Sequence, residues 1–255
     1  MSTLLEARGI GKRFGGIEAL SAISLTIARG EIYGLIGPNG AGKTTFFNVL
    51  TGVYRADDGG FTFNGAPLTA KAPHEVAAAG IARTFQNIRL FGNMSALENV
   101  MVGRHVRTHA GVLGAVLRGA GTRAEERAIH ARAHALLEYV GLAARGNDLA
   151  HSLSYGDQRR LEIARALATD PTLLALDEPA AGMNATETAT LRSLLERIRA
   201  DGTTLLLIEH DMKLVMGLCD RIAVLDYGRK IAEGPPAAVR RDSAVIEAYL
   251  GGEIA

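Results

Sequence analysis

The stretch Gly37-Pro38-Asn39-Gly40-Ala41-Gly42-Lys43-Thr44-Thr45 decides the fold of this chain. It fits the template of a phosphate-binding loop, in which a Gly is followed by four residues and then by Gly-Lys-Ser/Thr. The apolar run 32–36 before the loop predicts a buried strand, and the apolar residues at helical spacing between Phe46 and Leu50 predict a helix after it. Strand, glycine loop and helix are therefore expected in the order that the motif requires.

The glycines let this loop curl, so that successive backbone N–H groups can point at phosphate oxygens. The start of the following helix adds the positive end of its dipole at the same place. The Lys43 ammonium can reach the β- and γ-phosphates, and the Thr44 hydroxyl can hold Mg²⁺. A plain glycine-rich turn with an exposed Lys43 is the alternative, but it would not need these residue types in register. The sequence predicts a site for a nucleoside triphosphate.

Composition excludes several classes of protein. A chain of 255 residues is long enough for one large domain or two small ones. The net charge of +1 gives no electrostatic footprint for nucleic acid. Cys219 is the single cysteine, so no intramolecular disulfide is expected, which fits a reducing compartment. No apolar run approaches the roughly 18 residues of a membrane-spanning helix. We therefore expect a soluble protein that acts at a membrane only by docking on another protein.

Short apolar segments and helical stretches alternate along much of the chain. Strands are expected before the loop and again in the last third, at 5–10, 23–27, 173–176, 203–208 and 222–225. Near-continuous apolar strands between helices favour a buried, largely parallel sheet. The middle is different, because the chain becomes helical from about Ser95 to Leu142, with predicted capping boxes at Ser95…Glu98 and Thr122…Glu125. This block, continuing to about residue 166, is predicted to be an α-helical insertion in an α/β domain.

Polar side chains follow three of the predicted strands. Asp177 and Glu178 come directly after the strand 173–176, in the crevice where parallel sheets bind ligands. Asp177 suits the Mg²⁺ shell, and Glu178 can polarise the attacking water. His210 follows the strand 203–208 and is a candidate for sensing the γ-phosphate. Gln86 ends a predicted strand over 81–86 and is a candidate for a water or Mg²⁺ contact.

A second anion site is predicted at the stretch 153–167. Apolar residues at helical spacing give this stretch one buried face, and Ser154 is a plausible N-cap. Ser154 and the exposed N–H groups near Gly156 therefore lie at a helix start suited to phosphate. One nucleotide needs only one phosphate cradle. The second is explained if it closes over a nucleotide held by another subunit.

Together these stretches resemble the nucleotide-binding subunits of ABC transporters, over nearly the whole chain. The matching motifs are Walker A at 37–45, the Q-loop at Gln86, the signature at 153–158, Walker B at 173–178, the D-loop at 180–184, the switch histidine at His210 and the adenine-stacking aromatic at Phe14. The resemblance implies an ABC ATPase fold, which is a P-loop core with a mostly parallel sheet, an antiparallel β segment and an α-helical subdomain. It implies one domain over 1–255, with a catalytic core of 1–86 and 167–255 and a helical subdomain of 87–166.

The resemblance also implies the roles of the site residues. ATP and Mg²⁺ are the expected cofactors, and catalysis would rest on Glu178, His210 and Gln86. The cation would be held by Thr44, Gln86 and Asp177. The nucleotide would be bound by Phe14, by Gly37, Pro38, Asn39, Gly40, Ala41, Gly42, Lys43, Thr44 and Thr45, and by Ser154, Gly156 and Gln158 of an opposing subunit.

Three residues depart from the common family pattern. Tyr155 and Asp157 stand where the wider superfamily has glycines in Leu-Ser-Gly-Gly-Gln, and Asn184 replaces an Asp in the D-loop. These departures also narrow the subfamily to which the chain is similar. The stretches 14–20, 153–162, 209–212 and 245–251 are similar to one of the two ATPases of branched-chain amino acid importers. Related importers of urea or amides share much of this pattern, so the solute stays open.

The resemblance implies a cytoplasmic ATPase on the inner face of a membrane. Its expected partners are a second ATPase subunit, in a hetero- or homodimer, two permease subunits and, indirectly, a substrate-binding protein. The segment 87–91 is expected to help form the permease groove, with core packing as the alternative. A soluble ABC ATPase of DNA repair or translation is the competing function, but long heptads, a second cassette and basic patches are missing. A small-molecule kinase would leave the signature stretch unexplained.

Overall fold

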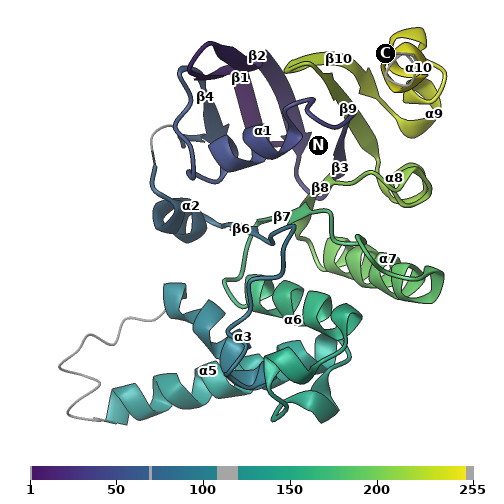
Figure 1. Cartoon of the computed structure of the whole chain (residues 1–255). Coiled ribbons are helices and arrows are strands. Elements are labelled where there is room, and N and C mark those ends of the chain that lie inside the picture. Colours follow the sequence, from purple (N-terminus) through teal and green to yellow (C-terminus); the bar gives the residue numbers. More distant parts are fainter. Residues whose placement is uncertain (1, 69–70, 108–119, 251–255) are drawn as a thin grey trace.

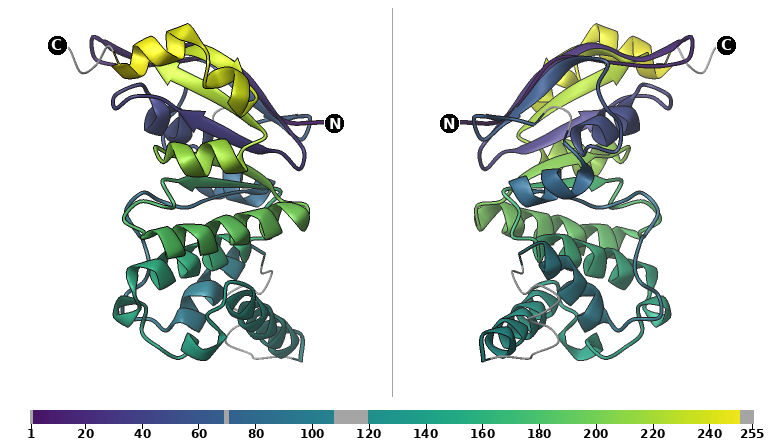
Figure 2. Two further views of the ribbon diagram at one scale, coloured as in Figure 1. Left: turned by 90° about the vertical axis from the view of Figure 1, so that its right-hand side faces the viewer. Right: turned by 90° about the vertical axis from the view of Figure 1, so that its left-hand side faces the viewer.

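A computed structural model of the protein describes residues 2–68, 71–107 and 120–250. Two sheets and the helices packed on them fill the upper part of the view in Figure 1, and a group of helices fills the lower part. The two side views in Figure 2 show the same division, with α5 (Ala120–Tyr139) at the end far from the strands. No helix among the described residues is both long and apolar enough to cross a membrane.

The central sheet has six strands and carries the ends of the predicted site motifs. Its strands lie in the order β10-β9-β3-β8-β7-β6, and all neighbours are parallel except β10 with β9. The bounds are β3 (Ile32–Ile36), β6 (Ile81–Arg83), β7 (Leu173–Asp177), β8 (Thr204–Ile208), β9 (Arg221–Asp226) and β10 (Arg229–Gly234). Parallel order brings the carboxyl ends of β3, β7 and β8 to one edge, as the sequence predicts.

A second, four-stranded sheet is antiparallel. Its order is β2-β1-β4-β5, and its strands are β1 (Thr3–Phe14), β2 (Ile17–Ala28), β4 (Asp58–Phe63) and β5 (Ala66–Pro67). β1 and β2 are longer than the predicted strands 5–10 and 23–27. β1 begins and ends on exposed residues and β2 begins on them, so the apolar pattern alone could not show their full length.

Both faces of the central sheet are buried, which explains its continuous apolar strands. In β8, Leu206 and Ile208 pack with α1 (Lys43–Leu50) and the antiparallel sheet, whereas Leu205 and Leu207 face the other side. That second side is covered by α7 (Ala185–Ala200) and α8 (Met212–Leu218), whose apolar residues share one core with it. A small helix α2 (Pro73–Ala79) precedes β6, and α9 (Pro236–Val239) and α10 (Ser243–Leu250) follow β10.

The helical part consists of α3 (Ala96–Arg104), α5 and α6 (Tyr155–Leu167), which pack on one another, with short 3₁₀ turns beside them. Leu136, Leu137 and Val140 form the predicted apolar stripe and join the same core as the central sheet. The helical part and one side of the central sheet therefore share one hydrophobic core. The first predicted capping box is confirmed, because the Ser95 hydroxyl accepts from the Glu98 N–H at 3.2 Å and the Glu98 carboxylate accepts from the Ser95 N–H at 2.7 Å.

Two local predictions are wrong. Thr122 lies inside α5, so Thr122…Glu125 is not a box at its start. The strand predicted over 81–86 ends at Arg83, and Thr84 to Gln86 leave the sheet toward the site. The last residue of the predicted stretch 245–251, Gly251, lies outside the described residues.

Candidate nucleotide and catalytic site

The phosphate loop joins β3 to α1, in the predicted order of strand, loop and helix. Two positions of the loop require glycine because the backbone of another strand lies close to them. Gly37 has a φ of 150°, and a Cβ there would lie 2.1 Å from the Leu225 carbonyl oxygen. Gly42 has a φ of 98°, and a Cβ there would lie 2.7 Å from the Ala19 carbonyl oxygen. No other residue fits either position without moving β2 or β9.

Lys43 is the first residue of α1 and is buried. Its ammonium donates to the carbonyls of Gly37 at 2.6 Å and of Pro38 at 2.9 Å. Burial lowers the pKa of this amine, and the nearby carboxylates of Glu178 and Asp177 oppose that shift. The ammonium is thus held over the loop by carbonyls that phosphate oxygens can replace.

A hollow of about 420 Å³ opens beside the loop. Its lining includes Gln86 and Glu178, which brings two predicted catalytic residues to the predicted phosphate site. Thr44, whose side chain is exposed, and Thr45 also line it. The lining from the loop is Asn39, Gly40, Ala41, Gly42, Lys43, Thr44 and Thr45, and the rest of the wall is Ile17, Glu18, Ala19, Tyr227 and Gly228.

Two of the predicted catalytic side chains, Gln86 and His210, converge on one carboxylate oxygen of the third, Glu178. Gln86 Nε2 donates to Glu178 Oε2 at 3.0 Å, and His210 Nδ1 lies 3.6 Å from the same oxygen. Glu178 has a φ of 47°, uncommon for a non-glycine residue, and its N–H donates to the Ile208 carbonyl at 2.8 Å. The strands therefore hold Glu178 in a strained conformation that aims its carboxylate at Gln86 and His210.

Asp177 ends β7 and is buried, with 2% of the residue exposed. Burial raises the pKa of its carboxyl to about 6, against the opposing charge of Arg83, whose Nη2 lies 3.8 Å away. Its Oδ1 has no hydrogen-bond partner among the described residues. A buried carboxylate oxygen left without a partner is costly, and a cation in the site would satisfy it.

The residues present fit Mg²⁺. The unpartnered oxygen of Asp177 supplies a carboxylate, and Thr44 and Gln86 supply a hydroxyl and an amide oxygen. Among the described residues, no group of three His, Cys, Asp or Glu side chains could hold a metal. A site of few protein ligands is the kind that Mg²⁺ uses when phosphate oxygens and waters complete its shell.

Sequence reasoning missed Glu209, a buried residue one position before His210. Its carboxylate accepts from the N–H groups of Ala180 at 2.7 Å and His210 at 3.1 Å. Burial raises the pKa of this carboxyl, and these backbone donors oppose the shift. Glu209 thus fixes the backbone after Glu178 and beside His210. Its position at a strand end was the available signal.

Phe14 does not line the hollow. Its ring packs edge-on against Tyr54, with centroids 5.2 Å apart, and is 43% exposed. The large apolar side chains that do line the hollow and stand exposed are Ile17 and Tyr227, at 72% and 86%. The structure thus places Phe14 outside the hollow, and Ile17 and Tyr227, which the sequence analysis missed, line it. The only signal for Ile17 was its place directly after Gly15-Gly16.

The signature residues lie apart from this hollow, on the helical part (Figure 1). Ser154 caps α6, its hydroxyl accepting from the Asp157 N–H at 3.2 Å, and Gln158 Nε2 donates to the Leu153 carbonyl at 3.0 Å. Gly156 is buried against α7, where a Cβ would lie 2.8 Å from Glu187 Oε1. The predicted N-cap at Ser154 is confirmed, whereas the second anion site stays a prediction, and its residues do not line the hollow beside the phosphate loop of their own chain.

Asn184, the D-loop departure, has a local role. Its side-chain oxygen accepts from the N–H groups of Thr186 at 2.9 Å and Glu187 at 3.0 Å, and so caps α7. An amide performs this role as well as a carboxylate does.

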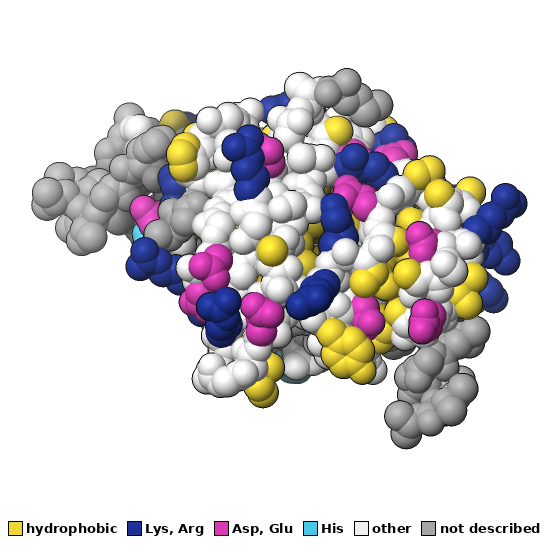
Figure 3. Space-filling model, turned by 90° about the horizontal axis from the view of Figure 1, so that it is seen from above, with side chains coloured by type: hydrophobic (Ala, Val, Ile, Leu, Met, Phe, Trp, Pro, Cys, Tyr) yellow, Lys and Arg dark blue, Asp and Glu magenta, His cyan; other side chains and the backbone are white. Residues whose placement is uncertain are grey.

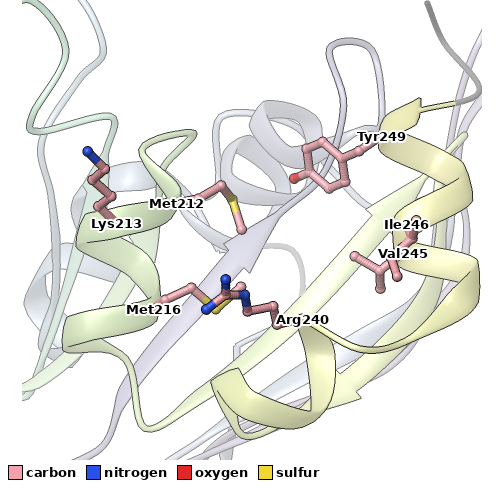
Figure 4. A pocket seen from close by; sticks show the side chains of 7 residues that line it. All are labelled: Met212, Lys213, Met216, Arg240, Val245, Ile246 and Tyr249. Atoms are coloured by element: carbon pink, nitrogen blue, oxygen red, sulfur yellow. The ribbon is translucent and has the colours of Figure 1, made fainter.

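An apolar hollow of about 520 Å³ lies between α8 and α10, as Figure 4 shows. Met212 and Met216 line it from α8, and Tyr249 points toward Met212 from α10. Burial raises the pKa of the Tyr249 phenol, and a hydrogen bond from the Gly37 backbone opposes that shift. The C-terminal helix is therefore attached to the first residue of the phosphate loop.

Comparison with known proteins agrees with this geometry. A family model described as ABC transporter matches residues 20–181, and one described as branched-chain amino acid ATP-binding cassette transporter matches 229–255. The chain is 46% identical over 249 residues to the high-affinity branched-chain amino acid transport ATP-binding protein LivG of Salmonella typhimurium, covering 97% of this chain and 98% of that protein. It is 43% identical, with the same coverage, to the corresponding BraF of Pseudomonas aeruginosa.

A solved structure resembles the whole chain. It is the ADP conformation of an ATP-binding cassette of an ABC transporter, 33% identical, with a TM-score of 0.86 over 98% of this chain and 100% of that one. The predicted fold class is confirmed.

Proposed function

This chain belongs to the ABC transporter family and is an ATPase, and we propose that it powers the import of branched-chain amino acids, or of a related small polar solute, through partner permeases. ATP hydrolysis is supported above all by one observation, which is that Gln86 and His210 both approach Glu178 beside the loop that contains Lys43. The C-terminal match over 229–255 and the LivG and BraF relatives support the solute class.

The geometry supports hydrolysis by an attacking water. The loop N–H groups and the Lys43 ammonium would bind the β- and γ-phosphates, exchanging the carbonyl contacts of Lys43 for phosphate oxygens. Glu178 Oε2 would accept the proton of the water as its oxygen bonds to the γ-phosphorus and the bond to the bridging oxygen of ADP breaks. Gln86 and His210 would orient the carboxylate and the water. Mg²⁺, held by Thr44, Asp177 and Gln86, supplies charge neutralisation on the phosphates when bound.

We infer that two ATPase subunits share each nucleotide. Ser154, Gly156 and Gln158 form a helix start suited to phosphate but stand away from the loop of their own chain. In a pair of subunits, these residues of one chain would meet the γ-phosphate of a nucleotide, and the phosphate loop of the opposing chain would bind the rest of that nucleotide. The second subunit is a copy of this chain or a related ATPase.

The permease is proposed to dock in a groove between the two parts of the molecule. A hollow of about 310 Å³ there is lined by Phe85 and Phe91 of the segment after β6 and by residues of α2, α3 and α6. Val53, Phe91 and Val106 line it with 41–48% of each residue exposed. Exposed apolar residues around a groove are typical of a protein contact. Such docking would place the chain on the inner face of a membrane, below a permease pair that receives solute from a substrate-binding protein.

The competing function, a soluble ABC ATPase of DNA repair or translation, finds no support in these relatives. Over the middle of the face shown in Figure 3, Lys and Arg side chains are interspersed with Asp and Glu side chains and do not form a continuous basic patch. Binding to nucleic acid would call for such a patch.

Purification of the tagged chain from gently solubilised membranes tests the proposal. Two polytopic permeases and a second short ATPase, or a second copy of this one, are expected to accompany it. Recovery of ribosomal or DNA-bound partners without any membrane protein would overturn the transport function and leave the ATPase chemistry.

A further inference from the structure

The signature residue Tyr155 makes two specific contacts. The first is with Arg159, one turn further along α6 and therefore on the same face. The Tyr155 hydroxyl lies 3.0 Å from Arg159 Nη2. Arg159 is 2% exposed, so the Tyr155 phenol is one of the few groups in contact with its buried guanidinium.

The same guanidinium holds the backbone of the Q-loop. Arg159 Nη1 donates to the Phe85 carbonyl at 2.6 Å, and Nη2 donates to the Gln86 carbonyl. Glu162, also buried, lies 3.3 Å from Arg159 Nη1 and accepts from the Phe85 N–H at 3.3 Å. Hydrogen bonds to buried charged groups are stronger than neutral ones, so Arg159 and Glu162 fix where Gln86 leaves the sheet.

The second contact of Tyr155 is with the D-loop. Gly182 has a φ of 76°, and a Cβ there would lie 3.3 Å from the Tyr155 ring, which shows that the ring rests on this glycine. Gly182 belongs to the turn that begins at Glu178, whose carbonyl accepts from the Ala181 N–H at 3.2 Å. The ring therefore rests on the turn that carries the catalytic carboxylate.

These contacts form a closed ring of interactions around the site. Tyr155 contacts Arg159, which donates to the Gln86 carbonyl, and the Gln86 side chain donates to Glu178 at 3.0 Å. From Glu178 the turn leads to Gly182, on which the Tyr155 ring rests. Tyr155 is also 44% exposed and adjoins Ser154, the residue that would receive phosphate from the opposing subunit. One side chain thus joins the signature to both loops that position Glu178.

We propose that Tyr155 is a positioning residue, which couples engagement of the signature by the opposing subunit's nucleotide to the geometry of Gln86 and Glu178 in its own chain. The inference rests on the proposed function. A shift of the α6 start moves the phenol, the phenol moves Arg159, and Arg159 moves the Q-loop backbone. Tyr155 itself touches neither the nucleotide of its own subunit nor the attacking water.

Tyr155→Phe separates the two contacts, because it removes the hydroxyl and keeps the ring on Gly182. The steady-state kinetics of ATP hydrolysis are measured in the purified transporter complex. Loss of one hydrogen bond to a charged group predicts a kcat lower by about three- to tenfold, with the KM for ATP within about twofold of wild type. Tyr139→Phe is the matched control, since the Tyr139 phenol lies 2.7 Å from Asp201 Oδ2, away from the site. It should leave kcat unchanged.

Thermal unfolding of both variants distinguishes positioning from a structural role. Similar small losses of Tm in the two variants, with a lower kcat only in Tyr155→Phe, would support the inference. Equal kcat in wild type and Tyr155→Phe would overturn it, and so would a fall in kcat matched by Tyr139→Phe. Absence of ATP hydrolysis in the wild-type complex would instead contradict the proposed function itself.

Discussion

At the scale of single residues, Glu178 shows how the fold prepares its chemistry. Its left-handed backbone is uncommon and is kept in place by the Ile208 carbonyl and by the Glu209 carboxylate, which holds Ala180 nearby. Strain of this kind persists only where the surroundings over-determine it. Here it directs one oxygen toward Gln86 and His210 from two other loops.

Glu178→Gln should keep nucleotide binding and lower kcat by at least about a hundredfold, because an amide cannot accept the proton of the attacking water. Hydrolysis of ATP and binding of a fluorescent ATP analogue are the measurements. Glu196→Gln is the control, since that carboxylate pairs with Arg192 on the surface of α7. Near wild-type turnover in Glu178→Gln would show that the base is another residue.

Asp177→Asn should raise the stability of the metal-free protein and abolish Mg²⁺-dependent ATP hydrolysis. The carboxyl has a pKa of about 6 in the folded chain and an ordinary value of 3.8, so its ionisation opposes folding. Above pH 6 the variant should therefore be more stable, by about 1–3 kcal/mol. The gain should shrink as the pH falls through about 6, where Asp177 becomes neutral in the folded protein.

Urea unfolding in EDTA across pH 5 to 8 checks this prediction, with Mg²⁺-dependent ATP hydrolysis measured in parallel. Hydrolysis should be lost although stability rises. A variant less stable than wild type at pH 7.5 would contradict the expected cost of the buried carboxylate.

At the scale of the elements, strands, loops and caps could be predicted to different degrees. The buried strands β3, β7 and β8 were predictable because both faces are covered, which leaves a continuous apolar run. The capping box at Ser95 could be predicted because it depends on just two nearby residues, Ser95 and Glu98. The extra length of β1 and β2 was not, since exposed residues carry no periodic pattern.

Ser154→Ala and Ser95→Ala form a matched pair at this scale. Each serine caps a helix and accepts one backbone N–H at 3.2 Å, so each loss should cost about 1 kcal/mol in the free energy of unfolding. Only Ser154→Ala should also lower ATP hydrolysis, because only Ser154 would meet the opposing nucleotide. Equal activity of the two variants would argue against the shared site.

The candidate site was predictable where motif and strand end coincide. Lys43, Glu178 and His210 follow buried strands and Asp177 is the last residue of one, and the parallel sheet brings those ends to one edge. Ile17 and Tyr227 were missed because they reach the hollow from the first position of β2 and from the turn between β9 and β10, which nothing in the local sequence directs toward the loop. The role of Tyr155 depends on contacts with residues 85–86 and 182, far away along the chain, which no single stretch reveals.

At the scale of the whole molecule, two features favour work in an assembly. The signature residues do not line the hollow beside the phosphate loop, which supports the proposal that a second ATPase subunit completes the site. The groove that contains Phe85 and Phe91 adjoins the Q-loop held by Arg159. Movement of a docked permease would therefore reach Gln86 through a short and rigid path, which is the coupling that an importer requires.

ATP hydrolysis at Glu178 is expected to drive solute import, and this can be measured as uptake of labelled leucine into proteoliposomes. The vesicles contain the complex purified through this chain, ATP inside them and a matching substrate-binding protein outside. The wild-type complex should accumulate leucine, and a complex with Glu178→Gln should not, although it still assembles and binds ATP. Accumulation that continues in the Glu178→Gln complex, or a wild-type complex that hydrolyses ATP without moving leucine, isoleucine, valine, urea or an amide, would contradict the account.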